Sequence, residues 1–354
     1  MAAFDIKKLL QSVVTHGASD LHLVSRTEPQ IRLDGVLKPV NLPVMTGEDI
    51  EEMAYSLLTE KQKQQFEENW ELDFALLIPG IGRFRANYYK TLGETAAAFR
   101  IIPIEIPSLD DLGSPHVYKS LIKREKGLIL VTGPTGSGKS TTLAAMLNEI
   151  NLHEQKHIIT VEDPVEFIHQ NKKCVFSHRG VGEDTNSFAL ALKYAMRQDP
   201  DVILIGEMRD KETIEAGLTA AETGHLVFAT LHTSSASGTI NRIIDVFSGD
   251  EQPQIRAMIS SSLVAVIAQA LLPKLGGGRV AASEILITNH AISNLIREDK
   301  VHQIYSQMQL GQGDTGMQTQ TQALVKFIRD GKISRDVALQ YANKPDELSK
   351  ATIK

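Results

Sequence analysis

The sequence predicts an α/β fold in two parts, with a smaller α+β domain before a larger domain built on a parallel sheet. First, an apolar run at 128–131 is followed by a glycine-rich turn and a helical pattern, the order strand, loop, helix. Second, short apolar runs at 157–161, 202–205 and 226–230 recur later in the chain, as in buried parallel strands. Third, the N-terminal part ends in consecutive strand-like segments, which favour an antiparallel meander.

Composition narrows the classes of protein. A chain of 354 residues suggests two domains, and a net charge of -6 disfavours a broad nucleic-acid-binding surface. Cys174 is the single cysteine, so disulfide frameworks and multi-cysteine zinc sites are excluded. We see no signal peptide. The longest apolar stretch, Leu263 to Leu272, is interrupted by Gln269 and is too short for a membrane span. We therefore expect a cytoplasmic protein without a transmembrane segment and without a nucleic-acid partner.

The N-terminal elements follow from periodicity and turn signals. An apolar face predicts a first helix, which ends at Gly17. The face is formed by Phe4, Ile6, Leu9, Leu10, Val13 and Val14. Strands are expected at 21–24 and 30–33, with Asp34-Gly35 as a hairpin turn. Thr46 and Asp49 predict a capped helix to about Leu58, and a second helix extends to about Asn69. Strands then follow at 72–78, 83–89 and 95–102.

Three arginines lie on the last two of these strands. Arg83 and Arg85 alternate with Phe84 and so share one face, and Arg100 lies on the next strand. A solvated sheet face is the simpler interpretation from the residues alone. Prolines at 103, 107 and 115 then indicate a linker. We therefore predict domains at 1–103 and 116–354, joined by a linker at 104–115.

The glycine-rich turn fits the phosphate-binding pattern G-x-x-x-x-G-K-[ST]. Its glycines let backbone N–H groups face a phosphate at the helix N-terminus. Lys139 would reach the β- and γ-phosphates, and the Ser140 hydroxyl would hold Mg²⁺. A flexible glycine turn is the alternative, which the flanking strand and helix disfavour. The predicted nucleotide-binding residues are Gly133, Pro134, Thr135, Gly136, Ser137, Gly138, Lys139, Ser140 and Thr141.

Acidic and histidine side chains follow the later strands. Glu162, Asp163 and Glu166 come after the run at 157–161, at the sheet edge where ligands bind in open parallel sheets. Glu207 follows 202–205 in the position of a Walker B acid, with Glu for the usual Asp, and would hold Mg²⁺ directly or through water. A single acid after a strand is usually an ordinary loop residue. The phosphate-binding loop earlier in the chain favours a Mg²⁺-binding role for Glu207.

Two histidines, His225 and His232, bracket the strand at 226–230. The Thr-Ser-Ser-Ala run after His232 suggests a sensor loop, whereas metal ligation is disfavoured because no ligand cluster accompanies them. Farther on we expect a long helix at 253–272, a glycine turn at 276–278 and a strand at 280–287. Helices follow near 290–297, 301–308, 317–329 and 334–341, and the last ten residues are expected to fray.

The motifs in this order resemble the secretion ATPase superfamily. GPTGSGKSTT (133–142), VEDPVEFIH (161–169), ILIGEMRD (203–210) and TGHLVFATLHT (223–233) correspond to its Walker A, Asp box, Walker B and His box. GASDLHL (17–23), RFR (83–85), GGGRVAASEILI (276–287) and GMQT (316–319) narrow the resemblance to the type IV pilus retraction ATPases. One departure is AISNLIRE (291–298), where Ser293 replaces the arginine usual in that family.

The resemblance implies a RecA-like P-loop ATPase domain preceded by a PAS-like domain, in a homohexamer that binds ATP with Mg²⁺. It implies that Glu207 is the Walker B acid and that Glu166 polarises the attacking water, with Glu162 and Asp163 close by. His225 and His232 correspond to the His-box sensors. Arg85 and Arg100 correspond to arginines that reach phosphates, with Arg83 as a third candidate. For these arginines the resemblance therefore favours a phosphate-binding role over the solvated sheet face that the residues alone suggest.

The implied activity is ATP-driven retraction of type IV pili, and hence twitching motility. The implied partner is the inner-membrane platform protein of the pilus machine, which would hold the ring at the membrane, and a second retraction ATPase is left open. The alternatives are a paralogous retraction ATPase, a pilus-extension or type II secretion ATPase, a DNA-handling RecA-like motor, and a regulatory subunit that binds nucleotide without turnover. Extension ATPases usually carry a longer N-terminal region and a four-cysteine zinc segment, which disfavours them here.

Overall fold

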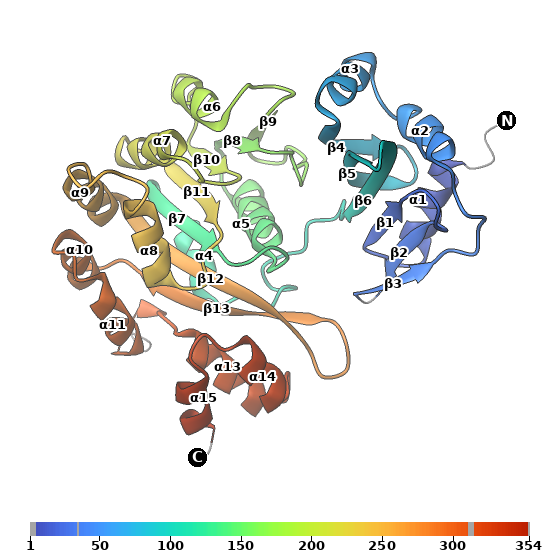
Figure 1. The fold of residues 1–354 in the computed structure, drawn as a ribbon. Coiled ribbons are helices and arrows are strands. Elements are labelled where there is room, and N and C mark those ends of the chain that lie inside the picture. Colours follow the sequence, from blue (N-terminus) through green and yellow to red (C-terminus); the bar gives the residue numbers. More distant parts are fainter. Residues whose placement is uncertain (1–4, 34, 311–314, 353–354) are drawn as a thin grey trace. The chain divides into compact units, whose positions relative to one another are not determined.

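The computed structural model describes residues 5–33, 35–310 and 315–352. Its contacts divide the chain into two compact units, residues 1–105 with 164–168, and residues 106–163 with 169–354. The predicted α/β class is confirmed, because each unit is built on a sheet with helices packed against it (Figure 1). Among the described residues, no helix is both long and apolar enough to cross a membrane.

Within the described residues, the smaller unit is a six-stranded antiparallel sheet with three helices. Its strand order is β3-β2-β1-β6-β5-β4, which confirms the predicted meander of the last three strands. The predicted capping box of Thr46 and Asp49 begins α2, which ends at Tyr55. The predicted Phe4 and Asp34 lie outside the described residues. The elements are α1 (Ile6–Thr15), β1 (Asp20–Leu23), β2 (Gln30–Leu33), β3 (Val36–Pro39), α2 (Gly47–Tyr55), α3 (Glu60–Asn69), β4 (Glu71–Ile78), β5 (Gly82–Thr91) and β6 (Glu94–Ile102).

The larger unit has a seven-stranded sheet with helices on both faces. The strand order is β13-β12-β7-β11-β10-β8-β9, and β13 alone is antiparallel to its neighbour. The elements up to the end of this sheet are α4 (Val117–Leu121), β7 (Gly127–Thr132), α5 (Lys139–His153), β8 (His157–Glu162), β9 (Val175–Gly180), α6 (Phe188–Ala195), β10 (Val202–Ile205), α7 (Lys211–Glu222), β11 (Leu226–Leu231), α8 (Ala236–Ile244), α9 (Gln252–Ser262), β12 (Leu263–Pro273) and β13 (Arg279–Ile287).

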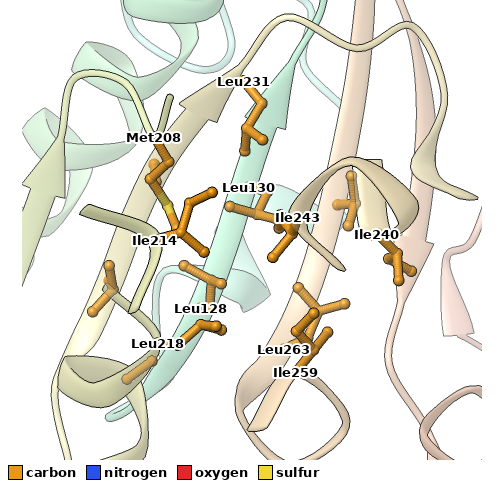
Figure 2. Close-up of a cluster of buried hydrophobic side chains, with 14 of the residues drawn as sticks. Leu128, Leu130, Met208, Ile214, Leu218, Leu231, Ile240, Ile243, Ile259 and Leu263 are labelled. Carbon is orange, nitrogen blue, oxygen red and sulfur yellow. The ribbon is translucent and has the colours of Figure 1, made fainter. Parts of the chain in front are cut away.

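Alternate residues of β7 point into two separate cores. Leu128 and Leu130 belong to a buried cluster with residues of α7, α8 and α9 (Figure 2). Ile129 and Val131 belong to a cluster with residues of α4 and α5 on the other face. Successive side chains of a strand point to opposite faces of the sheet, and both faces are covered here. All the residues of β7 that enter a core are therefore apolar, which explains its continuous apolar run. The two cores fix β7, and β7 positions the glycine-rich turn that follows it.

Two predictions in the C-terminal part were wrong. The helix predicted at 253–272 ends at Ser262, and Leu263–Pro273 is strand β12, buried between β7 and β13. A continuous apolar run cannot distinguish a buried strand from a buried helix by periodicity. The last ten residues were expected to fray, but they contain α15 (Pro345–Ala351), anchored by the fully buried Leu348. The few apolar residues of this polar segment gave no clear periodic signal.

The remaining helices follow β13. They are α10 (His290–Arg297), the 3-10 helix η1 (Val301–Gln303), α11 (Ile304–Leu310), α13 (Gln320–Arg329) and α14 (Arg335–Tyr341). Helices α13 to α15 share a small core with Leu272 of β12 and Ala282 of β13. The C-terminal helices are therefore packed on the edge of the larger sheet rather than extended from it.

Candidate active site

The turn between β7 and α5 has the backbone shape of a phosphate cradle. Gly133, Gly136 and Gly138 have φ angles of 145°, 79° and 86°, which side-chain-bearing residues rarely adopt. Gly138 precedes α5, and no side chain caps that helix N-terminus. An anion at this position would receive hydrogen bonds from backbone N–H groups of the first turn. The loop therefore fits the phosphates of a nucleotide.

Gln269 of β12 supports this loop through side-chain hydrogen bonds. The residue is buried, its Nε2 donates to the Ser137 carbonyl at 2.7 Å, and its Oε1 accepts from the Thr142 hydroxyl at 3.0 Å. A Cβ at Gly133 would lie 2.2 Å from the Gln269 backbone oxygen. Sequence analysis did not identify Gln269 as a functional residue, although a polar residue within an apolar run was a visible signal.

Lys139 points back into the loop in this structure. Its Nζ donates to the Gly133 carbonyl at 2.9 Å and to the Pro134 carbonyl at 3.1 Å. The Ser137 hydroxyl is buried, and no hydrogen-bond partner is found for it among the described residues. The Ser137 hydroxyl is therefore a polar group that a phosphate oxygen could satisfy.

The parallel sheet brings several predicted residues to the same edge. Glu162 ends β8, Glu207 follows β10, and His232 follows β11, whose Leu231 pairs with Thr132 of β7. The Gly206 N–H donates to the Val161 carbonyl at 2.7 Å. A Cβ at Gly206 would lie 3.1 Å from the Cα of Glu162, so the ends of β10 and β8 are in close contact.

Glu207 has two basic neighbours. His232 Nε2 lies 3.1 Å and Arg209 Nε lies 2.6 Å from its Oε1. Burial acts to raise the pKa of Glu207, but Arg209 and His232 outweigh it, so the pKa lies below its usual range. Glu207 is therefore an ionised carboxylate at neutral pH, which is the form that a metal ligand requires.

A second pair of histidines supports the segment after β8. The His178 Nδ1 lies 3.0 Å from the Thr160 hydroxyl, and its Nε2 accepts the His169 N–H at 3.2 Å. The rings of His169 and Phe176 are stacked with centroids 4.5 Å apart. Burial, followed by the charge of His178, lowers the pKa of His169 to about 3, so its ring is neutral. Neither His178 nor the strand that carries it, β9, was predicted.

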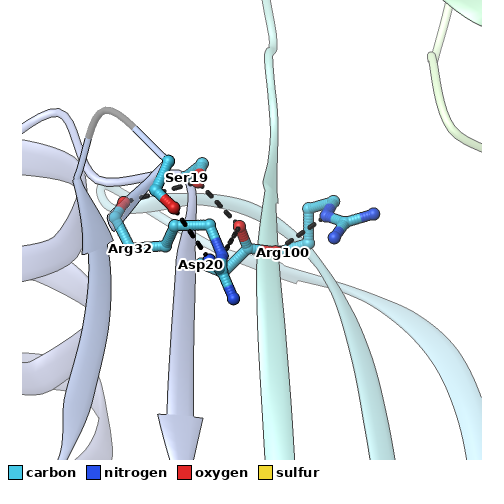
Figure 3. Close-up of polar contacts among 5 residues, drawn as sticks. Ser19, Asp20, Arg32 and Arg100 are labelled. Carbon is cyan, nitrogen blue, oxygen red and sulfur yellow. Dashed lines mark hydrogen bonds and ion pairs between the residues drawn. The ribbon is translucent and has the colours of Figure 1, made fainter. Parts of the chain in front are cut away.

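The smaller unit contains Glu166 together with the three predicted arginines. Arg83 donates to the carbonyls of Val165 and Glu166 at 2.6 and 2.7 Å. Arg85 pairs with Asp73 and stands directly opposite Arg100 across β5 and β6. Arg100 Nε lies 2.8 Å from Asp20, which also approaches Arg32 (Figure 3). The arginines are thus brought together, and each has a partner within this unit.

The structure does not bring His225 to the edge that carries the phosphate loop. It precedes β11, and its Nδ1 lies 3.0 Å from the Ala220 carbonyl. His232 stands beyond the other end of this six-residue strand, a separation of roughly 20 Å at about 3.3 Å per residue. Asp163 is exposed, next to the buried Glu162.

Comparison with known proteins identifies the family. The family described as type II/IV secretion system protein matches residues 2–277, and the chain belongs to it. It is 50% identical over 342 residues to the type IV pilus retraction ATPase PilT of Pseudomonas aeruginosa, covering 97% of this chain and 99% of the relative. It is 47% identical over 348 residues to a twitching motility protein of Neisseria gonorrhoeae, covering 98% and 93%. The predicted resemblance is therefore confirmed.

Solved structures agree with this assignment. A crystal structure of the pilus retraction motor PilT with bound ADP superposes with a TM-score of 0.90 at 49% identity, covering 98% of this chain and 99% of that one. The ATPase DotB of Legionella pneumophila superposes with a TM-score of 0.81 at 26% identity, covering 95% of both chains. The predicted fold, a P-loop ATPase domain after a smaller sheet domain, is that of these proteins.

Proposed function

We propose that this chain is a motor ATPase that hydrolyses ATP to retract type IV pili, and so powers twitching motility. The observation that carries the proposal is the identity of 50% to a pilus retraction ATPase over 97% of the chain. The cradle formed by Gly133, Gly136 and Gly138 supports it independently, because its geometry suits nucleotide phosphates.

In this proposal Lys139 exchanges the carbonyls of Gly133 and Pro134 for the β- and γ-phosphate oxygens. Ser140 and Glu207 hold Mg²⁺, which would neutralise charge on the phosphates. His232 lies against Glu207 and senses the state of that site. Glu166 polarises the attacking water, with Glu162 and Asp163 close by. The order of the motifs supports these roles, and the ionised state of Glu207 supports its own.

We assign Arg85 and Arg100 to the phosphates of a nucleotide, with Arg83 as a third candidate. Like charges directly opposite each other on a sheet destabilise it, and Arg85 and Arg100 are such a pair. Asp73 and Asp20 compensate them locally. An arrangement that costs stability is consistent with retention for function, in which the arginines exchange these aspartates for phosphate oxygens.

The proposed assembly is a homohexamer in the cytoplasm, held at the inner membrane by the platform protein of the pilus machine. A role for His225 in hydrolysis would then require a site to which a neighbouring protomer contributes, because the strand β11 separates it from the phosphate loop of its own chain. Ser293 favours a second candidate, a paralogous retraction ATPase that works beside another. The identity of 39% to the type IV pilus ATPase PilU, against 50% to PilT, favours the first.

The test has a biochemical and a cellular part. Lys139→Ala should abolish ATP turnover by the purified protein and weaken ATP binding, because the transition state loses its charge stabilisation. Lys126→Ala, which changes an exposed lysine before β7, should leave turnover unchanged. A strain that lacks the gene should carry excess surface pili and fail to twitch. A strain without pili would assign extension instead, and normal turnover by Lys139→Ala would remove the ATPase assignment.

A further inference from the structure

The segment after His232 is held at its middle and at its end by residues distant in the sequence. We call residues 232–236 the sensor loop. The Ala236 N–H at its end donates to Glu284 Oε1 of β13 at 2.8 Å, and the Ser234 carbonyl accepts from Asn343 Nδ2 at 2.7 Å. Asn343 lies between α14 and α15, so the C-terminal helices contact the sensor loop directly.

Glu284 is a buried carboxylate, only 3% exposed. Burial raises its pKa, and backbone hydrogen bonds from Ala236 and Gln320 act against that rise. Ala236 begins α8 and Gln320 begins α13, so one carboxylate lies at the N-termini of two helices. Helix N-termini favour a negative group. This residue therefore ties the end of the sensor loop to the first turn of α13.

Gln320 completes the connection. Its Oε1 accepts the Asn343 N–H at 2.7 Å, and its Nε2 donates to the Tyr341 carbonyl at 3.2 Å. The contacts form a closed ring from Ser234 through Asn343, Gln320 and Glu284 to Ala236. A closed ring restrains the loop from two sides, so displacement of α13 or α14 would move the backbone that carries His232.

We propose that Asn343 and Glu284 are positioning residues, through which the C-terminal helices set the place of His232 against Glu207. The proposal rests on the role assigned to His232 above. Neither residue reaches the nucleotide site in this account. They act by holding the loop so that the 3.1 Å contact between His232 and Glu207 is maintained during turnover. The C-terminal helices thereby gain control over hydrolysis without contributing a group to the chemistry.

The first test is Asn343→Asp, which keeps the shape and removes the donor to the Ser234 carbonyl. Because Asn343 is exposed, the variant should fold, with a melting temperature lowered by no more than about 4 °C for the loss of one hydrogen bond. We expect kcat to fall about fivefold, the equivalent of one net hydrogen bond of about 1 kcal/mol, with an unchanged Kd for ATP. Gln340→Ala is the matched control, since it removes an exposed amide from α14 and should retain normal kcat. An unchanged kcat in Asn343→Asp, or an equal loss in Kd, would overturn the proposal.

The second test is a double-mutant cycle with His232→Ala. If Asn343 acts through His232, the double variant should be no slower than His232→Ala alone, whereas additive losses would contradict the proposal. Glu284→Gln should lower kcat in the same non-additive way, because its amide keeps only one oxygen to accept hydrogen bonds from the backbone N–H groups of Ala236 and Gln320. Normal turnover in His232→Ala alone would instead show that the proposed role of His232 is wrong.

Discussion

At the scale of single residues, the ionisation of Glu207 depends on its neighbours. Burial alone would raise its pKa, and the Arg209 and His232 side chains reverse that effect. The carboxylate is therefore present above its lowered pKa, and its interactions are lost as the pH falls through that value. A Mg²⁺ ligand in this position would be protonated only in distinctly acidic solution.

Arg209→Ala should move the acidic limb of the pH profile of kcat/KM to higher pH. The variant loses the cation 2.6 Å from the carboxylate while the burial remains, so the pKa of Glu207 rises. The measurement is the rate of ATP hydrolysis across the acidic range. Arg242→Ala removes an exposed arginine from α8 and should leave the limb in place. An unmoved limb in Arg209→Ala would show that another group sets it.

The sequence predicts the local geometry of some site residues but not the long-range contacts of others. The backbone shape of the glycine-rich turn was predictable because its glycines lie within one short motif whose geometry is local. Gln269 was not, because it contacts Thr142 across 127 positions of the chain. The same holds for Asn343, which reaches Ser234 across 109 positions. Contacts of this kind depend on strand order and helix placement, which single residues do not encode.

At the scale of elements, periodicity identified the strands that bear the site and failed at β12. The apolar runs at β7, β8, β10 and β11 were assigned correctly because each is short and ends in a turn signal. The run at β12 follows α9 without any such signal, so helix and strand could not be distinguished. The error concealed a residue that supports the glycine-rich turn, because only a strand beside β7 places Gln269 next to Gly133.

Gln269→Leu should therefore weaken nucleotide binding. The Ser137 carbonyl and the Thr142 hydroxyl would each lose a buried partner, at a cost of about 1–3 kcal/mol per group. If about half of this loss destabilises only the nucleotide-bound state of the loop, the Kd for ATP rises roughly tenfold. Titration with a fluorescent nucleotide measures it. Gln254→Ala, an exposed site on α9, should bind normally. A Kd for Gln269→Leu equal to that of the unaltered protein would contradict this account of the loop.

At the scale of the whole molecule, a retraction motor must convert hydrolysis into mechanical work, and we expect α10 to transmit that work rather than to take part in the chemistry. Ile292 and Ile296 are buried in the core that β7 shares with α9, and Leu295 packs against it. Ala291, next to Ile292 on this helix, is exposed. Arg297 is exposed as well, with a hydrogen bond of 3.5 Å to Asn294 on its own helix.

Arg297→Ala should separate ATP turnover from pilus retraction. The side chain contributes little to the fold, because exposed substitutions change stability by about 0.5 kcal/mol or less. The melting temperature should therefore be close to normal, and we expect kcat to stay within a few-fold of normal. Because the guanidinium is available to a partner, we expect retraction to fail when the variant replaces the native gene, as scored by twitching and by excess surface pili. Arg329→Ala, an exposed arginine of α13, is the matched control and should twitch normally. If Arg297→Ala also twitches normally, this arginine does not transmit force, and α10 contributes only its packing against α9.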